Sequence, residues 1–238
     1  LEGTETKVIL AIGHKLPRWP ECRIPDWVTE NNAEEQLHQL ITSLVNRYRN
    51  HPNLYGWQVE NEALFPFGEC PEWSSSRSRL KDLIRLTKEL DPDHPVMTTD
   101  SGELSTWLRT ASLPIDELGI SLYRTAYTEQ DYYFYWPVNP YFYKTHFSLV
   151  KPLVPKLFIS ELQLEPWGPH SVKDLSYDDI YASFSPYDFS ERFDFAQRTG
   201  ATTILGWGVE WWYYMKEVRG DSDYWDEAVK VFKNEGEE

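Results

Sequence analysis

The sequence is poor in cysteine and contains no long apolar run. Its two cysteines, Cys22 and Cys70, are too few to form a metal site by themselves. No stretch approaches the roughly 18 continuous apolar residues of a transmembrane helix, and no signal peptide is visible at the start, Leu1-Glu2-Gly3. These absences argue against a membrane-embedded protein and against a zinc site made of thiolates.

Positive charge is also scarce. Lys and Arg together number 23 against 38 Asp and Glu, which gives a formal net charge of −15. A field of that sign repels phosphate backbones and anionic lipid surfaces, whereas it leaves neutral polymers unaffected. The composition therefore predicts neither a nucleic-acid nor a membrane partner, and it is compatible with a polysaccharide as the partner.

The two cysteines leave the compartment open. Both Cys22 and Cys70 fall in loops directly after consecutive predicted strands, which would place them on the same face of the fold. They are either two free thiols or a loop-to-loop disulfide, and the disulfide would imply an exported enzyme. Secretion is slightly favoured over a cytoplasmic location.

Aromatic residues, by contrast, are abundant. They make up 16 % of the chain and include 11 Trp. Tryptophan faces stack on sugar rings, but they also fill cores and interfaces. The segment 127–143 is the richest: it either lines subsites for a glucan or mannan chain, or packs on a neighbouring subunit or on the chain's own helices.

Short apolar runs alternate with amphipathic helical patterns along the whole chain. The predicted strands are residues 7–13, 53–59, 96–99, 118–122, 156–160 and 202–206. Six strand–helix units predict an α/β fold, a TIM-type (β/α) barrel, with residues 1–238 as a single partial barrel domain. A complete barrel has eight units, so either the first two are missing or the strands form an open sheet whose edges need cover. A homo-oligomer is one possible cover.

One helix start is specified in detail. Asn32 and Glu35 have the spacing of a capping box, ahead of an apolar stripe that begins at Leu37. We therefore expect the Asn32 side chain to cap this helix.

The strongest chemical signal is the stretch WQVENEALF, residues 57–65. A buried strand there ends on Asn61-Glu62, which places an amide beside a carboxyl group at a strand end, where parallel α/β folds place their chemistry. The amide can hydrogen-bond a sugar 2-hydroxyl while the carboxyl group protonates the leaving oxygen. The bland alternative is a polar pair that only marks the end of the strand.

A second carboxylate follows a second apolar run. In ISELQLEPW, residues 159–167, Glu161 is expected at the tip of the strand. Glu165 is its local competitor and should lie out in the loop. Two carboxylates that face each other are what glycosidic bond cleavage needs, and a retaining enzyme places them about 5 to 5.5 Å apart.

These stretches together resemble a known family. WQVENE and ISELQLEPW are similar to the acid/base and nucleophile motifs of clan A retaining glycoside hydrolases. KVILAIGHKLPRWPE, ELDPDHPVMTTDSGE and GWGVEWWYY extend the resemblance to cellulase-type family 5 relatives, over essentially the whole chain and onto strands three to eight of that barrel. The family's first two strands, with a second-strand Arg that supports the nucleophile, have no counterpart here.

The resemblance implies roles for particular residues. Glu62 would be the general acid/base and Glu161 the nucleophile. Asn61 would contact the sugar 2-hydroxyl, and Tyr123 would hydrogen-bond the nucleophile. At the eighth strand, Trp207 or Trp211 would form the floor of the site for the sugar that is attacked.

Two further residues are candidate substrate contacts. His14 follows the first predicted strand, where it could orient the sugar or be a satisfied core histidine. Trp167 lies in the loop after the Glu161 strand. A metal-dependent barrel enzyme is a weaker alternative, because no Asp/Glu/His trio appears on successive strands, so neither a metal nor another cofactor is expected.

The sequence thus predicts a retaining β-glycoside hydrolase that acts on a β-linked glucan or related polysaccharide through two glutamates. The first choice of activity is an endo-acting β-1,4-glucanase or related hemicellulase, and the second is an exo-acting β-glycosidase. The alternative outside the enzyme class is a catalytically impaired, sugar-binding barrel.

Overall fold

The computed structural model describes residues 3–18, 20–22, 24–65 and 76–234. The described residues form two compact units: those that fall within 1–119 and 149–157, and those that fall within 120–148 and 158–234. Six strands form one sheet in the order β1-β2-β3-β4-β7-β8, and the pairs β1–β2, β2–β3 and β7–β8 are parallel. Strands β4 and β7 each run from one unit into the other. The predicted (β/α) pattern of six units is confirmed.

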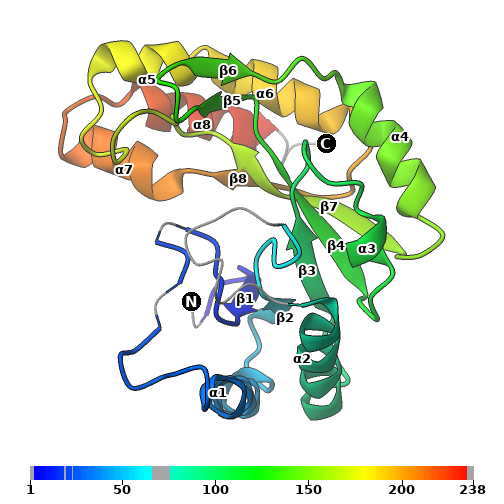
Figure 1. The fold of residues 1–238 in the computed structure, drawn as a ribbon. Helices are drawn as coiled ribbons and strands as arrows, with labels where there is room; N and C mark the ends of the chain where they lie inside the picture. Colours follow the sequence, from blue (N-terminus) through cyan, green and yellow to red (C-terminus); the bar gives the residue numbers. More distant parts are fainter. Residues whose placement is uncertain (1–2, 19, 23, 66–75, 235–238) are drawn as a thin grey trace. The chain divides into compact units, whose positions relative to one another are not determined.

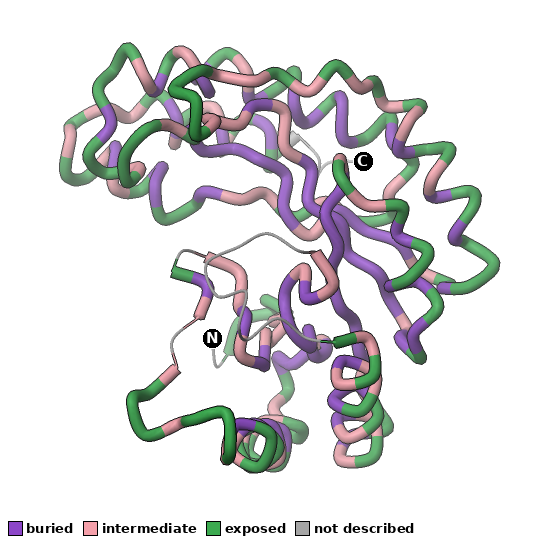
Figure 2. The backbone as a smooth tube through the Cα atoms, viewed as in Figure 1, coloured by how far each residue is buried: buried purple, intermediate pink, exposed green. Residues whose placement is uncertain are grey.

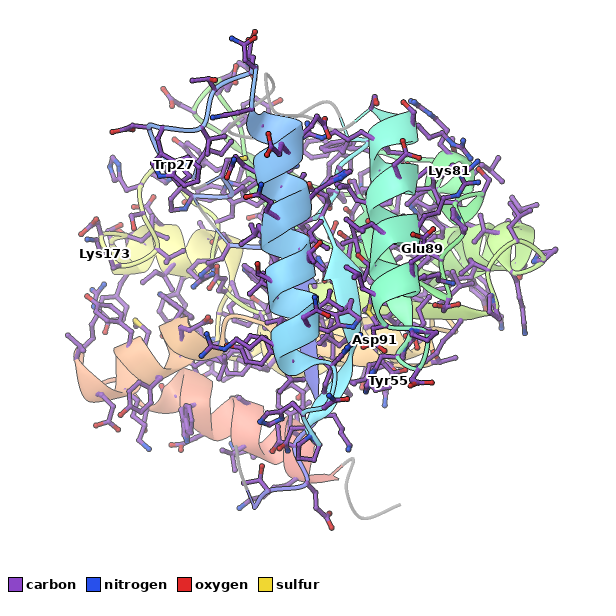
Figure 3. All side chains as sticks on the ribbon, turned by 90° about the horizontal axis from the view of Figure 1, so that it is seen from below. Trp27, Tyr55, Lys81, Glu89, Asp91 and Lys173 are labelled. Carbon is purple, nitrogen blue, oxygen red and sulfur yellow. The ribbon has the colours of Figure 1, made fainter. Side chains whose placement is uncertain are left out.

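The first unit holds the beginning of the sheet. Its elements are β1 (Val8–Ile12), α1 (Ala33–Tyr48), β2 (Leu54–Val59), α2 (Arg77–Leu90), β3 (Val96–Asp100), α3 (Leu108–Ala111) and the start of β4 (Glu117–Leu122). Helices α1 and α2 pack against each other (Figures 1 and 3), and α2 contacts β2 and β3. The apolar stripe predicted for α1 is buried through Leu37, Ile41 and Val45, because residues at this spacing share one helix face.

The expected capping box at the start of α1 is wrong. The Asn32 side chain makes no capping hydrogen bond to the helix. Its Oδ1 accepts from the Thr29 amide at 2.7 Å, and its Nδ2 donates to the Trp27 carbonyl at 3.1 Å. The amide thus closes the turn before the helix, and Glu35 accepts from Gln39 one turn further along.

The second unit holds the end of the sheet and a separate hairpin. Its elements are β5 (Thr125–Tyr127), β6 (Tyr133–Tyr135), α4 (Pro140–Val150), β7 (Lys156–Gln163), α5 (Tyr177–Ser183), α6 (Asp188–Gln197), β8 (Ile204–Trp207), α7 (Val209–Glu217) and α8 (Asp223–Asn234). The end of α4 and the first residues of β7 belong to the first unit. β3, β4 and most of β7 are buried (Figure 2), as strands covered on both faces should be.

The aromatic segment 127–143 begins within the antiparallel hairpin β5–β6, which the sequence did not predict. Its tyrosines bind α5: the Tyr133 hydroxyl donates to Asp179 at 3.1 Å, and the Tyr135 hydroxyl donates to the Ala182 carbonyl. Tyr143 is buried against Phe195 of α6. The segment therefore packs partly on the chain's own helices, one of the two uses that its composition allowed.

Candidate active site

The two candidate catalytic carboxylates belong to different units. Glu62 is the third residue after β2, in the first unit. Glu161 lies inside β7, two residues before the strand ends at Gln163, in the second unit, so its expected position at the strand tip is wrong. Each unit positions its carboxylate by a local set of contacts.

In the first unit the backbone turns sharply at the end of β2. Glu60 and Glu62 have φ values of 60° and 46°, the left-handed region that costs a residue with a Cβ energy. The Glu60 amide donates to the Ile12 carbonyl and the Asn61 amide to the Lys15 carbonyl, both at 2.8 Å. These bonds to the end of β1 hold the strained conformation in place.

The side chain of Asn61 is oriented by hydrogen bonds to its oxygen. Oδ1 accepts from the Thr99 hydroxyl at 2.7 Å and from Gln58 Nε2 at 3.1 Å. The same Thr99 hydroxyl accepts from the Glu62 amide at 2.9 Å. Both donors bind the side-chain oxygen of Asn61. The side-chain NH₂ group is therefore the part of Asn61 that can donate to a ligand. Buried Thr99, at the end of β3, thus positions two candidate site residues at once.

His14 follows β1 in the same unit. Its Nδ1 lies 2.8 Å from an Arg79 guanidinium nitrogen. Burial, aided by the charge of Arg79, lowers the pKa of His14 to about 4. Since arginine can only donate, Nδ1 is the acceptor and the neutral ring carries its proton on Nε2.

In the second unit Glu161 accepts a hydrogen bond from the residue that the resemblance implies. The Tyr123 hydroxyl donates to Glu161 Oε2 at 2.8 Å. The Tyr123 ring meets the edge of Trp167 with 5.5 Å between centroids. Glu161 itself is 8 % exposed. The structure therefore brings Glu161, Tyr123 and Trp167 together.

The segment that carries Tyr123 is fixed by Gln163, a residue that sequence reasoning passed over. Gln163 Oε1 accepts from the Arg124 and Thr125 amides at 2.9 and 3.0 Å, and its Nε2 donates to the Thr125 carbonyl at 2.8 Å. The side chain thus pairs with the backbone beyond β4 as a strand would. In the sequence, the signal that could have identified Gln163 is a polar residue in an apolar stretch, two residues after a candidate nucleophile.

Glu165 does not lie out in solvent, as its loop position suggested. It is buried, and its Oε1 accepts from the Trp207 indole nitrogen at 3.0 Å. A Cβ on Gly208, where φ is +130°, would come within 2.9 Å of the Glu165 Cβ. Glycine at this position lets Glu165 and Trp207 meet at the ends of their strands.

Trp207 and Trp211 are placed differently. Trp207 ends β8 and is only partly buried. Trp211 is buried in α7, donates to the Val172 carbonyl at 3.3 Å, and packs edge-on against Tyr224 of α8 with 4.5 Å between centroids. Of the two, only Trp207 lies at a strand end with a partly exposed ring.

Across residues 3–18, 20–22, 24–65 and 76–234, no group of three or more His, Cys, Asp or Glu side chains could hold a metal ion. No helix in these ranges is long and apolar enough to cross a membrane. Cys22 is disulfide-bonded, and Cys70 lies outside the described residues.

Comparison with known proteins places the chain in a family. The family model "Glycosyl hydrolases family 2, TIM barrel domain" matches residues 13–197. No curated protein sequence gave a significant match. The clan-level resemblance is therefore confirmed, while the narrower one to cellulase-type family 5 is not.

Solved structures with the same fold include two xylanases. Xylanase 10B of Thermotoga maritima has a TM-score of 0.54 at 16 % identity, over 91 % of this chain and 73 % of that one. A thermostable mutant of a Cellvibrio japonicus xylanase has a TM-score of 0.52 at 16 % identity, over 88 % and 69 %. At this identity the likeness shows the fold alone.

A β-D-glucuronidase of Dictyoglomus thermophilum has a TM-score of 0.50 at 17 % identity, over 82 % of this chain. The chain spans only 32 % of that enzyme's length, and it spans less than two thirds of several other solved structures. With the family match covering most of its residues, the chain belongs to the TIM-barrel domains of glycosyl hydrolase family 2.

Proposed function

We propose that this chain is a retaining β-glycoside hydrolase in which Glu161 is the nucleophile and Glu62 the general acid/base. The observation that carries the proposal is the hydrogen bond from Tyr123 to Glu161, a mostly buried carboxylate inside a parallel strand of a glycoside hydrolase barrel. A hydroxyl that donates to one carboxylate oxygen favours the ionised form and fixes its orientation.

In the first step a Glu161 carboxylate oxygen attacks the anomeric carbon. The bond from that carbon to the leaving oxygen breaks, and the Glu62 carboxyl group gives its proton to this oxygen. Glu161 must be ionised and Glu62 protonated when the sugar binds. The Asn61 amide nitrogen donates to the 2-hydroxyl, consistent with the bonds that Thr99 and Gln58 make to its oxygen.

In the second step Glu62, now a carboxylate, takes a proton from water. The water oxygen attacks the anomeric carbon and the bond to Glu161 breaks, so the product keeps the β configuration. This double displacement requires carboxyl groups about 5 to 5.5 Å apart, and that separation of Glu62 and Glu161 is itself a prediction.

The substrate that fits is a neutral β-linked glucan or hemicellulose. The net charge of −15 disfavours anionic polymers, and Trp207 and Trp167 are partly exposed aromatic rings in the unit that carries Glu161. Xylanases are among the solved structures with this fold. We place endo-action on a β-1,4-linked chain ahead of exo-action.

The test is turnover of aryl β-glycosides and soluble β-glucans by the 238-residue chain, Glu161→Ala and Glu62→Gln. We expect Glu161→Ala to abolish turnover of every substrate. Glu62→Gln should lose turnover of substrates with poor leaving groups, by at least about 100-fold. Proton NMR of the first product formed should show the β anomer.

Glu191→Gln, which changes an exposed carboxylate on α6, is the matched control and should keep wild-type rates. A folded wild-type chain without turnover on any substrate would overturn the enzyme proposal. Sugar affinity that depends on Trp207 would then favour a sugar-binding barrel. Formation of the α anomer would instead exclude the retaining mechanism.

A further inference from the structure

The first unit contains a buried carboxylate that the proposed mechanism does not use. Glu60 is 1 % exposed and directly precedes Asn61-Glu62. Its Oε1 accepts from the His14 amide at 3.1 Å, and its Oε2 accepts from the Lys15 amide at 2.7 Å. Burial raises the pKa of Glu60, while these two backbone donors favour its charged form. These donors are needed, because a carboxylate buried at this depth without partners is strongly unfavourable.

The chain makes room for this carboxylate with a glycine. A Cβ on Gly13 would lie 2.6 Å from Glu60 Cδ and 2.8 to 2.9 Å from its two oxygens, closer than van der Waals contact allows. Gly13 also has a φ of +149°, which residues with a Cβ rarely adopt. The end of β1 is therefore shaped around the side chain of Glu60.

Backbone bonds run in the opposite direction between the same two segments. The Glu60 and Asn61 amides donate to the Ile12 and Lys15 carbonyls, while the Glu60 carboxylate accepts from the amides of His14 and Lys15. Four hydrogen bonds thus join residues 12–15 to residues 60–61, immediately before Glu62. The left-handed backbone of Glu60 and Glu62 needs such support to persist.

From this geometry we infer that Glu60 is a positioning residue: by binding the backbone just after β1, it sets the aim of the acid/base Glu62. The Asn61 side chain is held separately, by Thr99 and Gln58. The inference rests on the proposed function of Glu62. It assigns Glu60 no contact with the substrate.

Glu60→Gln tests the inference because it keeps the size of the side chain and removes one acceptor. An amide offers one oxygen, so its NH₂ group faces one of the two backbone amides, donor against donor. A misplaced acid matters most when the leaving group needs protonation, and a displacement of about 1 Å can cost about 100-fold in rate. The measurement is kcat/KM on 2,4-dinitrophenyl and 4-methoxyphenyl β-glycosides of the sugar that wild type prefers.

We expect kcat/KM to fall about 100-fold for the methoxyphenyl glycoside and no more than about threefold for the dinitrophenyl glycoside. If Glu60→Gln does not give a native circular dichroism spectrum, Glu60→Asp serves instead. It keeps the charge but is one methylene too short to reach both amides, and it should show the same contrast in a weaker form.

Glu117→Gln is the matched control, because Glu117 is a buried carboxylate of the same unit, at the start of β4, that binds Tyr55 and Lys156. Glu117→Gln should change kcat/KM for both substrates by the same factor. If the Glu60 variant loses kcat/KM equally on both substrates, the positioning role is overturned and Glu60 is a purely structural group. A wild-type chain without turnover would overturn the proposed function, and the assignment of Glu60 would fall with it.

Discussion

The two candidate catalytic carboxylates are positioned by different kinds of backbone. In the first unit β2 stops at Val59, and Glu62 is presented by a left-handed turn that bonds to residues after β1 and at the end of β3. In the second unit β7 continues past Glu161, which lies where the pairing of β7 with β8 shifts register, between Ile159 and Leu162, and one tyrosine hydroxyl orients the carboxylate.

The difference suits the two proposed roles. A nucleophile must hold one oxygen on a fixed line to the anomeric carbon, and strand backbone that is paired before and after Glu161 supplies that rigidity. The acid/base must reach the leaving oxygen from the side, which a segment beyond the end of its strand allows. We therefore expect variants at the Glu161 strand to lose rate without losing stability, and variants around Glu62 to lose both.

The largest effect is expected for Tyr123→Phe, which removes the hydroxyl that donates to Glu161. Loss of one preorganised donor to a reacting group costs about 100-fold or more in kcat. The ring is kept and is only partly buried, so the free energy of unfolding should change by less than about 1 kcal/mol. Steady-state kinetics and urea denaturation measure the two quantities. A large loss of stability with little loss of rate would contradict the contrast between the two strands.

Thr99→Val should have a smaller effect on rate and a larger one on stability. It deprives Asn61 Oδ1 of a donor and the Glu62 amide of its acceptor, at a buried position. Asn61 Oδ1 keeps its donor Gln58, so the main loss is the acceptor of the Glu62 amide. An unsatisfied buried group costs about 1 to 3 kcal/mol, and we expect kcat to fall about tenfold as Asn61 and Glu62 become less well positioned.

Its neighbour provides the control. Thr98 is also buried and donates to the Val59 carbonyl within the sheet. Thr98→Val should lower the midpoint of urea denaturation but leave kcat within about twofold. Equal kcat values for Thr98→Val and Thr99→Val would show that Thr99 does not position Asn61 and Glu62.

The smallest effect is a pH dependence that comes from His14. Its pKa is about 4 in the fold against an ordinary value of 6.5, so below pH 6.5 the unfolded chain binds more protons than the folded one. The stability contributed by neutral His14 is complete above pH 6.5 and is lost as the pH falls towards 4. In urea denaturation between pH 7 and pH 4.5, the stability difference between wild type and His14→Gln should shrink as the pH falls. A difference that does not change with pH would contradict the lowered pKa.

Much of this arrangement could be predicted from the sequence. The six strands and the main helices follow from apolar runs and stripes, because burial of those faces determines the fold. Asn61, Glu62 and Glu161 could be identified because polar groups that interrupt buried runs are conspicuous. The partner of Glu161 was implied by resemblance, and the contact with Tyr123 is present, although the catalytic roles stay predictions.

Other features depend on residues far apart in the chain. Polar residues in ISELQ suggested that the strand ends at Glu161, whereas β7 runs on to Gln163, whose side chain pairs with backbone 39 residues away. The burial of Glu165 depends on Trp207 and on the absence of a side chain at Gly208, about 40 residues later. No local pattern contains that information. The turn made by Asn32 was missed for the opposite reason, since a local motif has two local solutions.

The left-handed backbone at Glu62 has a consequence for how this sequence can evolve. A glycine there would relieve roughly 1 to 2 kcal/mol of conformational energy, and it would delete the proposed acid/base in the same change. A library screened only for heat resistance should therefore enrich glycine at position 62, whereas a library screened for turnover should retain glutamate there. The proposed acid/base role thus predicts a position at which selection for turnover and selection for stability favour different residues.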